Sequence, residues 1–526
     1  MIGAIVSTVL SARVRAALVL FSGALTALAL PPLDVVPAVF GWSVLAWAIR
    51  VAPGWRGAAL AGWLWALGYH VAGLHWIANA MVVNADQHAW LIPFAVLGLP
   101  AILALFTAVA AAVARRLADR GLALWAGFAG CVGLTEWLRG HVFTGFPWNL
   151  PGAALDAVLA LLQPASIVGA YGLGLATVLV ATAPALFFDP AVPRRRVGWL
   201  TAGLIMMVSV TWLWGEARIA TIADRPAVEG VRLRIVQGNV PQRDKWNPAL
   251  KPEHLSRYLR LSRADMAATV TSAGTPTVVA PTVVIWPETA VAHLFGARAD
   301  IARAVAAAIP PNGTLLFGAP RVDRRDATPV LHNSMVALEG RGVPRWIYDK
   351  FHLVPFGEYV PLRSILPLEP IVQGIRDFAP GPGPRTLELL GAPSVSLLVC
   401  YEAIFPGAVT APEQRPEWLL NATNDAWFGR FSGPHQHLAI ARLRSVEEGL
   451  PMARAANTGI SAMIDPVGRV LARLEIGVTG SLDVNLPRPI VNTVYGQFGD
   501  LGFFLAIILI LGIAVLARSF EVEKKQ

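Results

Sequence analysis

The sequence predicts a bundle of membrane-spanning helices joined to an α/β domain. A length of 526 residues exceeds one compact domain, and 55% hydrophobic against 15% charged residues is more apolar than a soluble protein. Apolar runs of bilayer length fill the first part of the chain, whereas strand-like and helix-like segments alternate after Val231. The formal charge of +9 falls in short clusters between apolar runs, so we expect a membrane partner and no nucleic acid.

Eight apolar segments are long enough, or nearly so, to cross a bilayer. Arg13 and Arg15 precede the first in the manner of a signal peptide, but the six further spans before residue 215 favour an uncleaved helix. Cys131, within a span, and the distant Cys400 do not indicate a disulfide framework. The predicted spans are Val14–Leu30, Val35–Ile49, Gly57–Ala80, Leu91–Ala114, Leu122–Leu138, Ala165–Phe188, Val197–Trp214 and Leu501–Leu516.

Arginine clusters fall in alternate connections between these spans. Because basic residues are enriched on the cytoplasmic side, these connections and both termini are predicted to be cytoplasmic. The loops Pro31–Asp34 and Met81–His88 contain no Lys or Arg and are predicted to lie on the opposite side. The predicted domains are a transmembrane bundle at 1–215, an extracytoplasmic catalytic domain at 216–497, and a final helix with a cytoplasmic tail at 498–526.

Two polar or aromatic features stand out in the bundle. Glu136 and Arg139 lie three residues apart near the end of the fifth span, where they fit either a structural ion pair or part of a functional site. The loop Gly140–Gly152 that follows contains Phe146 and Trp148. These aromatic residues fit an interfacial belt and a contact with a lipid substrate equally well.

The second half of the chain has the alternation of an α/β domain. VRLRIVQGNV from Val231 alternates like a strand, and Pro252–Ala268 has the pattern of an amphipathic helix. A domain of roughly 250 residues can bury a core of its own. Short apolar strands are predicted at Thr282–Trp286, Gly313–Phe317, Ser394–Val399 and Trp418–Asn421.

Three reactive side chains occur at the ends of such strands or in apolar stretches. Cys400 ends the run SVSLLVC, Glu288 follows a strand in WPET, and Lys350 opens KFHLVPFGEYVP. A thiol needs an adjacent base or cation to act as a nucleophile near neutral pH. Glu288 can take its proton, and Lys350 with backbone N–H groups near Tyr401 can stabilise an oxyanion.

A rival arrangement pairs the cysteine with a histidine. His435 and His437 in GPHQH are candidates for a base or for metal ligands. No third ligand at zinc-like spacing accompanies them in the sequence, so we expect a loop role for both, with no metal and no cofactor.

The motifs WPE, DKFHLVPFGEYVP and LLVCYEAIFP resemble the Glu, Lys and Cys motifs of the nitrilase (carbon–nitrogen hydrolase) superfamily. With several spans before the domain and one after it, the whole chain resembles the bacterial apolipoprotein N-acyltransferase family. The resemblance implies an αββα sandwich in which Glu288 is the base, Lys350 the oxyanion stabiliser and Cys400 the nucleophile. It further matches Glu358 and Glu402 to supporting acids, and Trp246, Tyr401 and Trp427 to aromatic positions near the acyl site.

Three functions are compatible with the sequence. The resemblance implies a monomeric acyltransferase of the bacterial inner membrane, with a periplasmic catalytic domain, that moves a phospholipid acyl chain through Cys400 to the α-amine of a lipoprotein's S-diacylglyceryl cysteine. The alternative is a membrane-bound amidase or nitrilase, in which water resolves the acyl-enzyme. A transporter or receptor would need charges deep in the membrane, where His70 and His75 are the main candidates.

Overall fold

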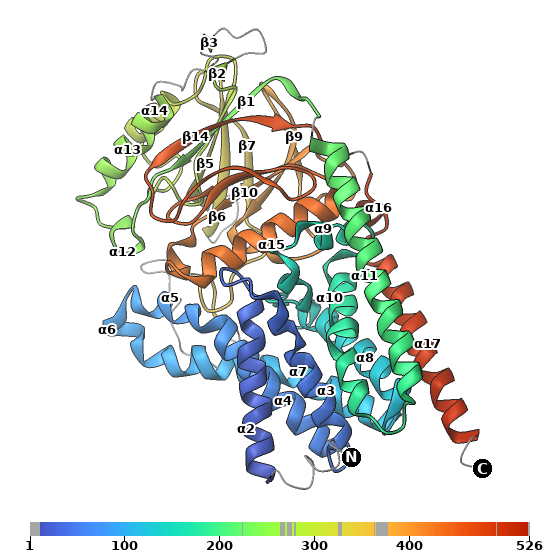
Figure 1. Cartoon of the computed structure of the whole chain (residues 1–526). Helices are drawn as coiled ribbons and strands as arrows, with labels where there is room; N and C mark the ends of the chain where they lie inside the picture. Colours follow the sequence, from blue (N-terminus) through green and yellow to red (C-terminus); the bar gives the residue numbers. More distant parts are fainter. Residues whose placement is uncertain are drawn as a thin grey trace. The chain divides into compact units, whose positions relative to one another are not determined.

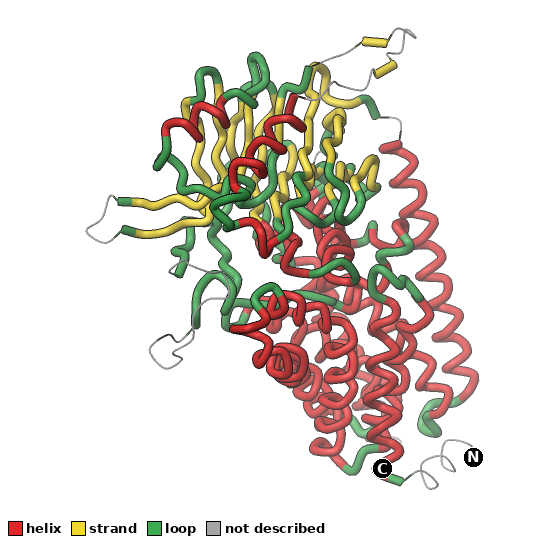
Figure 2. Tube along the Cα trace, turned by 90° about the vertical axis from the view of Figure 1, so that its left-hand side faces the viewer, coloured by secondary structure: helices red, strands yellow, loops and turns green. Residues whose placement is uncertain are grey.

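The computed structural model describes residues 11–223, 225–263, 269–270, 276–277, 280–324, 329–361, 363, 377–490 and 492–523. Contacts divide the chain into two compact units, which we call the helical unit and the α/β unit. The first is built from helices and the second contains the sheets (Figures 1 and 2). The helical unit comprises Met1–Ala78, Trp90–Ala220 and Asn492–Gln526, and the α/β unit comprises Asn79–Ala89 and Thr221–Val491.

Among the described residues, six helical segments are long and apolar enough to cross a membrane. They contain the helices α2 (Ala12–Thr26), α7 (Leu99–Leu117), α8 (Gly121–His141), α10 (Ala165–Thr182), α11 (Arg194–Ala223) and α17 (Leu501–Glu523). The chain is therefore a multi-pass membrane protein. The candidate spans are Ala12–Ala29, Ala85–Leu117, Gly121–His141, Ala165–Phe188, Arg194–Ala223 and Leu501–Ser519.

Two of the eight segments predicted to span the membrane are helical but are too short, or not apolar enough, to be candidate spans. Helix α3 (Gly41–Val51) belongs to the shorter apolar segment Val36–Val51. Helix α4 (Gly54–Leu74) has 21 residues, but its Gly, Trp, Tyr and His residues lower its mean hydropathy. Six candidate spans are thus found where the sequence analysis expected eight.

Close helix packing in the helical unit depends on glycine. Helix α4 packs against α2 and α7, and α8 packs against α7, α10 and α17. A Cβ atom at Gly23 of α2 would collide with the carbonyl oxygen of Trp65, and one at Gly68 of α4 would collide with that of Leu20. Small residues allow the backbones of membrane helices to approach in this way.

The ion pair predicted at the end of α8 is present and buried. Arg139 Nη2 lies 2.5 Å from Glu136 Oε2, and Arg139 Nη1 donates to the carbonyl oxygens of Phe146 (2.5 Å) and Trp148 (3.0 Å). The pair therefore fixes the loop that follows α8. Within this loop Trp148 is 1% exposed and packs on Trp76, whereas Phe146 is half-buried.

The α/β unit contains two six-stranded sheets. In each sheet three neighbouring strands are parallel and the remaining pairs are antiparallel. The first sheet has the order β14 (Gly480–Pro487), β1 (Ala227–Gln237), β4 (Val283–Ile285), β5 (Thr314–Asp323), β6 (Val330–Glu339), β7 (Val343–Asp349). The second has the order β13 (Val470–Leu474), β12 (Ser461–Ile464), β11 (Met452–Ala456), β10 (Trp418–Thr423), β9 (Ala392–Val399), β8 (Thr386–Leu389).

Alternation along the strands divides the side chains between two faces. In β1, Leu233 and Ile235 enter the core between the sheets, whereas Val236 packs on the opposite face. Helices α13 (Lys251–Arg263) and α14 (Ala299–Ala306) cover that outer face, and α15 (Ser432–Glu448) covers the outer face of the second sheet (Figure 1). The fold is the αββα sandwich that the resemblance implied.

The strand predicted from Val231 is part of β1, and the four short predicted strands correspond to β4, β5, β9 and β10. The other strands of the two sheets were not predicted. The amphipathic helix predicted from Pro252 is α13, which ends at Arg263. The last residues of that prediction, 264–268, lie outside the described residues. Short elements complete the fold: α5 (Ala78–Val82), α6 (Ala85–His88), α9 (Leu159–Leu162), α12 (Gln242–Lys245), α16 (Val494–Phe498), β2 (Thr269–Val270) and β3 (Pro276–Thr277).

Candidate active site

Glu288, Lys350 and Cys400 each follow the C-terminal end of a strand in the α/β unit, namely β4, β7 and β9. All three are buried, with exposed fractions of 6%, 1% and 5%. Lys350 Nζ lies 3.5 Å from Glu288 Oε1, and the charges of both residues act on the Cys400 thiol. The three residues predicted from separate motifs are therefore brought together at one buried point.

Lys350 lies between two carboxylates. Its Nζ donates to Glu358 Oε1 (3.0 Å) and lies 2.9 Å from Glu358 Oε2, with Glu288 slightly farther away. Burial alone would lower the pKa of Lys350, but the charges of Glu358 and Glu288 outweigh it and raise the pKa above its ordinary value. The ammonium group is therefore charged near neutral pH.

Asn333 of β6 connects these carboxylates, and the sequence analysis missed it. Its side-chain Nδ2 donates to Glu288 Oε1 (2.7 Å) and to Glu358 Oε1 (2.9 Å). Its backbone carbonyl accepts a hydrogen bond from the backbone N–H of Lys350 (2.9 Å). The second oxygen of Glu288 accepts the N–H of Asn424 (2.9 Å). Glu288 is thus held by neutral donors on both oxygens. Because Asn333 stands between His332 and Ser334, the sequence of β6 does not distinguish it from its polar neighbours.

Cys400 has a left-handed backbone, with φ +51°, at the point where β9 turns into a 3₁₀ segment. This conformation is uncommon for a residue other than glycine and often marks a functional turn. Burial raises the pKa of the Cys400 thiol and the charge of Glu288 adds to this, whereas Lys350 and a hydrogen bond with Thr423 oppose it. The thiol is therefore protonated at rest and needs a base to react.

His437 lies against the backbone of Cys400. Its Nε2 donates to the Cys400 carbonyl (3.2 Å), and its Nδ1 lies 3.0 Å from Asp425 Oδ1 and 3.1 Å from Arg454 Nη2. Because His437 and the half-buried His435 belong to helix α15, the expected loop role was wrong for both. Among the residues that the structure describes, no group of three or more His, Cys, Asp or Glu side chains could hold a metal ion.

Glu402 joins the segment after β7 to the segment after β9. Its Oε1 accepts the N–H of Phe351 (2.6 Å), and its Oε2 accepts the N–H of Val399 (2.7 Å) and the hydroxyl of Tyr348 (2.9 Å). Burial raises the pKa of Glu402 to about 7, although the two backbone donors favour its charged form. These contacts fix Lys350 and Cys400 relative to each other.

Three aromatic residues of the α/β unit were matched to positions near the acyl site. Tyr401 is buried and forms an edge-to-face contact with Phe405 (5.1 Å between ring centroids). Trp246 follows α12 and is half-buried, with Lys251 Nζ 5.4 Å from its ring, and Trp427 is half-buried in the 3₁₀ segment Asp425–Phe428. Within the described part of the chain, neither tryptophan hydrogen-bonds to Glu288, Lys350 or Cys400.

Comparison with known proteins gives two family matches that cover most of the chain. Residues 22–183 match the apolipoprotein N-acyltransferase N-terminal domain, and residues 235–489 match carbon-nitrogen hydrolase. The chain is 40% identical over 516 residues to an apolipoprotein N-acyltransferase of Rhodopseudomonas palustris, covering 96% of this chain and 95% of the relative. The corresponding protein of Bradyrhizobium diazoefficiens is 41% identical over 517 residues, with the same coverage. A solved amidase from Nesterenkonia sp. has 18% identity and a TM-score of 0.36, covering 53% of this chain and 98% of its own.

The membrane spans, the sandwich and the full-length matches together define a membrane-bound acyltransferase of the carbon–nitrogen hydrolase superfamily. Within that superfamily, the chain belongs to the apolipoprotein N-acyltransferase family.

Proposed function

We propose that the protein transfers an acyl chain from a phospholipid, through a thioester on Cys400, to the α-amine of S-diacylglyceryl cysteine at the N-terminus of lipoproteins. One observation carries this proposal: the charges of the Glu288–Lys350 pair act on the buried thiol of Cys400. The described residues of the same chain include six candidate membrane spans. The name of the relatives supports an apolipoprotein as the acceptor. A protein with membrane spans meets both lipid-anchored substrates in the bilayer where they reside.

In the first half-reaction Cys400 attacks the ester carbonyl of the phospholipid. Glu288 takes the thiol proton, which the raised thiol pKa makes necessary. Lys350, held in its charged form, and backbone N–H groups near Tyr401 stabilise the oxyanion. Protonated Glu288 then gives the proton to the departing alkoxide, which leaves as a lysophospholipid, and Cys400 retains the acyl chain as a thioester.

In the second half-reaction the neutral α-amine attacks the thioester carbonyl. An α-amine with an ordinary pKa near 8 is substantially neutral at working pH. Glu288 takes a proton from the attacking nitrogen as the carbon–sulfur bond breaks, and returns it to the Cys400 thiolate. The product is an amide, and the thiol and the carboxylate are restored.

The surrounding residues have supporting roles in this proposal. Glu358 keeps Lys350 charged, and Glu402 fixes the backbone between Lys350 and Cys400. We assign substrate contacts to five aromatic residues: Phe146, Trp148, Trp246, Tyr401 and Trp427.

The arginine distribution supports cytoplasmic termini and a periplasmic α/β unit, in the inner membrane of a bacterium. With the α/β unit tied to membrane helices at both of its ends, we further propose that the protein acts as a monomer.

Acyl transfer is tested by supplying the purified protein with a phospholipid that carries an isotope-labelled acyl chain, together with a synthetic diacylated lipopeptide. We expect the label in an amide of the lipopeptide. A matched lipopeptide with an acetylated α-amine controls for the site of transfer and should remain unlabelled. An amidase or hydrolase predicts the opposite: free labelled fatty acid at a rate that does not depend on the lipopeptide.

A further inference from the structure

A second lysine lies beside the proposed catalytic groups. Lys245 is the last residue of α12 and is 2% exposed. Its Nζ donates to the carbonyl oxygen of Glu288 at 3.5 Å, which is long for an N–H···O hydrogen bond. Within the described ranges no carboxylate forms an ion pair with Lys245, whereas Lys350 has two such partners. The two buried ammonium groups are therefore held in different ways.

Their protonation differs as a result. Burial lowers the pKa of Lys245 to about 8, and the charges of Glu288 and of a Cys400 thiolate only partly oppose this. The same carboxylate, together with Glu358, raises the pKa of Lys350. Both lysines are charged near neutral pH, but only Lys245 loses its proton under mildly alkaline conditions.

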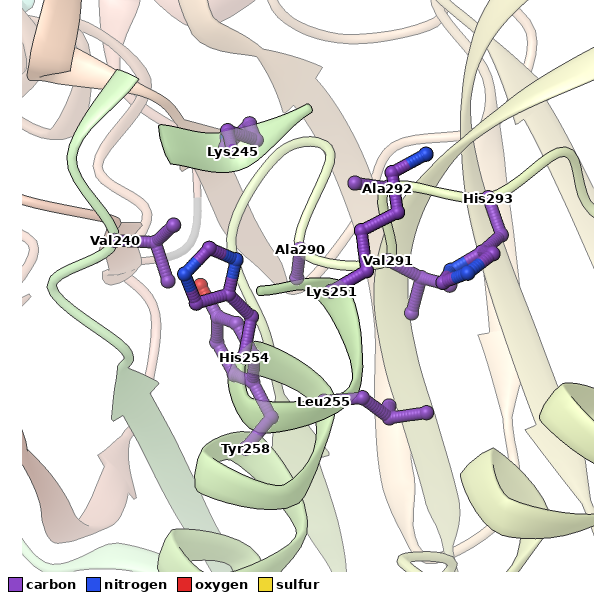
Figure 3. Close-up of a pocket in the computed structure, with 10 residues that line it drawn as sticks. All are labelled: Val240, Lys245, Lys251, His254, Leu255, Tyr258, Ala290, Val291, Ala292 and His293. Carbon is purple, nitrogen blue, oxygen red and sulfur yellow. The ribbon is translucent and has the colours of Figure 1, made fainter. Parts of the chain in front are cut away.

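A small pocket lies next to Lys245. Figure 3 shows Lys251 and His254 on α13, facing the loop from Ala290 to His293 that follows Glu288. The pocket volume is about 10 Å³, which is room for about one water molecule. His254 Nδ1 is buried without a partner in the part of the chain described, so a water there has polar neighbours.

Glu288 and a Cys400 thiolate act on the charge of Lys245, and Lys251, His254 and His293 line the pocket beside it. His254 and His293 are largely neutral near pH 7 because burial, with nearby cations, lowers their pKa, so they do not titrate on the alkaline side. Burial also lowers the pKa of Lys251. Further charged groups on these helices are Arg243 and Asp244 on α12 and Glu253 and Arg257 on α13, of which Asp244, Glu253 and Arg257 act on His254.

We propose that Lys245 is a positioning residue for acyl transfer: its ammonium group holds the peptide carbonyl of Glu288 and supplies a second positive charge that favours the Cys400 thiolate. Acylation is then faster when Lys245 is in its protonated form. This inference rests on the proposed roles of Glu288 and Cys400. Lys350 provides a charge that does not change with pH in the working range, and Lys245 provides one that does.

Three variants of the full-length protein test the proposal. The initial rate of Cys400 acylation is measured in phospholipid vesicles by intact mass from about pH 6 to about pH 10. The wild-type rate should fall above about pH 8, where Lys245 loses its proton. Below that pH, Lys245→Met should be roughly tenfold slower than the wild type, because the loss of one positive charge raises the pKa of the thiol by about one unit. The rate of Lys245→Met should not fall above about pH 8. Lys245→Arg should keep the fast plateau to higher pH, and the control Lys251→Met should match the wild type.

Alkylation of Cys400 by iodoacetamide provides a second readout that needs no lipid. Peptide mass analysis separates Cys400 from Cys131, and Lys245→Met should react roughly tenfold more slowly near neutral pH. The proposal is overturned if Lys245→Met has the wild-type rates and its acylation rate still falls above about pH 8. It is also overturned if Lys251→Met removes this fall in rate. If Lys245→Met does not fold, an unshifted alkaline fall in Lys245→Arg overturns it instead. A wild type that is not acylated contradicts the proposed function, whereas slow alkylation of Lys245→Met would still support the effect of Lys245 on the thiol.

Discussion

The two sheets of the α/β unit support the site in different ways. The groups of the first sheet, Glu288, Asn333 and Lys350, contact one another through their side chains. Cys400, at the end of β9 in the second sheet, is held through its backbone carbonyl by His437. The first sheet therefore supplies the charged groups Glu288 and Lys350, whereas the second sheet fixes the backbone that carries the sulfur atom.

Among changes to the groups of the first sheet, Glu288→Gln should have the largest effect on the reaction. This change keeps the shape of the side chain but removes the proton acceptor, so we expect acylation of Cys400 to slow by roughly 10²- to 10⁴-fold. Intact-mass kinetics with phospholipid measure the rate. Glu388→Gln, an exposed acid on β8, is the matched control and should leave the rate unchanged. A Glu288→Gln rate equal to that of the wild type would remove Glu288 from the reaction.

Asn333→Leu tests the side-chain contacts of the same sheet with a smaller expected effect. The amide donates to Glu288 and Glu358, and a hydrogen bond to a charged group is worth about 1.5–3 kcal/mol. We expect roughly 10- to 100-fold slower acylation. Intact-mass kinetics with phospholipid measure the rate. An Asn333→Leu rate equal to that of the wild type would contradict a role of these hydrogen bonds in the reaction.

A change of His437 tests whether the second sheet fixes the position of Cys400. His437→Leu leaves the Cys400 carbonyl with one donor fewer, so we expect roughly tenfold slower acylation and a lower Tm. Since this contact fixes position rather than charge, the pH dependence of Cys400 alkylation should not change. His437→Gln retains a donor and should recover part of the rate. A shift of the pH dependence of Cys400 alkylation in His437→Leu would contradict a purely positional role for this contact.

The smallest expected effect concerns Glu402, which links the two sheets. Its folded-state pKa of about 7 lies above the ordinary value of 4.5, so the folded protein binds this proton more tightly than the unfolded chain. The resulting stabilisation is fully present below about pH 4.5 and is lost as the pH rises to about 7. The Tm of the wild type relative to Glu402→Gln should therefore increase as the pH falls through this range. A Tm difference that does not depend on pH would contradict the raised pKa.

The sequence predicted the parts of the site that stand in continuous motifs. Glu288 and Cys400 each end or follow an apolar strand, and Lys350 stands in a segment rich in apolar and aromatic residues. The pairing of Glu136 with Arg139 was likewise predicted from their spacing, and the structure shows the contact. Such residues are predictable because their neighbours in sequence are also their neighbours in the fold.

Two residues of the site that stand outside these motifs, Asn333 and Lys245, were missed. Asn333 reaches Glu288 from β6, 45 positions away. Lys245 stands in the polar run PQRDKW, which is typical of a surface turn, and becomes buried only when α12 packs beside Glu288. The loop role of His435 and His437 was inferred from the lack of a third metal ligand, which gives no information on secondary structure, and helix α15 in fact begins at Ser432. The proline in GPHQH is compatible with this, because a proline is tolerated in the first turn of a helix. Helix α4 differed from its prediction as a span because the sequence analysis weighed length above mean hydropathy.

The central claim, that Cys400 carries a phospholipid acyl chain as a thioester, is tested most directly by the intact mass of the protein after incubation with phospholipid vesicles. We predict an added fatty acyl mass on the wild type that hydroxylamine removes, and no such mass on Cys400→Ala. An acyl mass that persists in Cys400→Ala, or a wild type that gains none under lipid supply, would contradict the account.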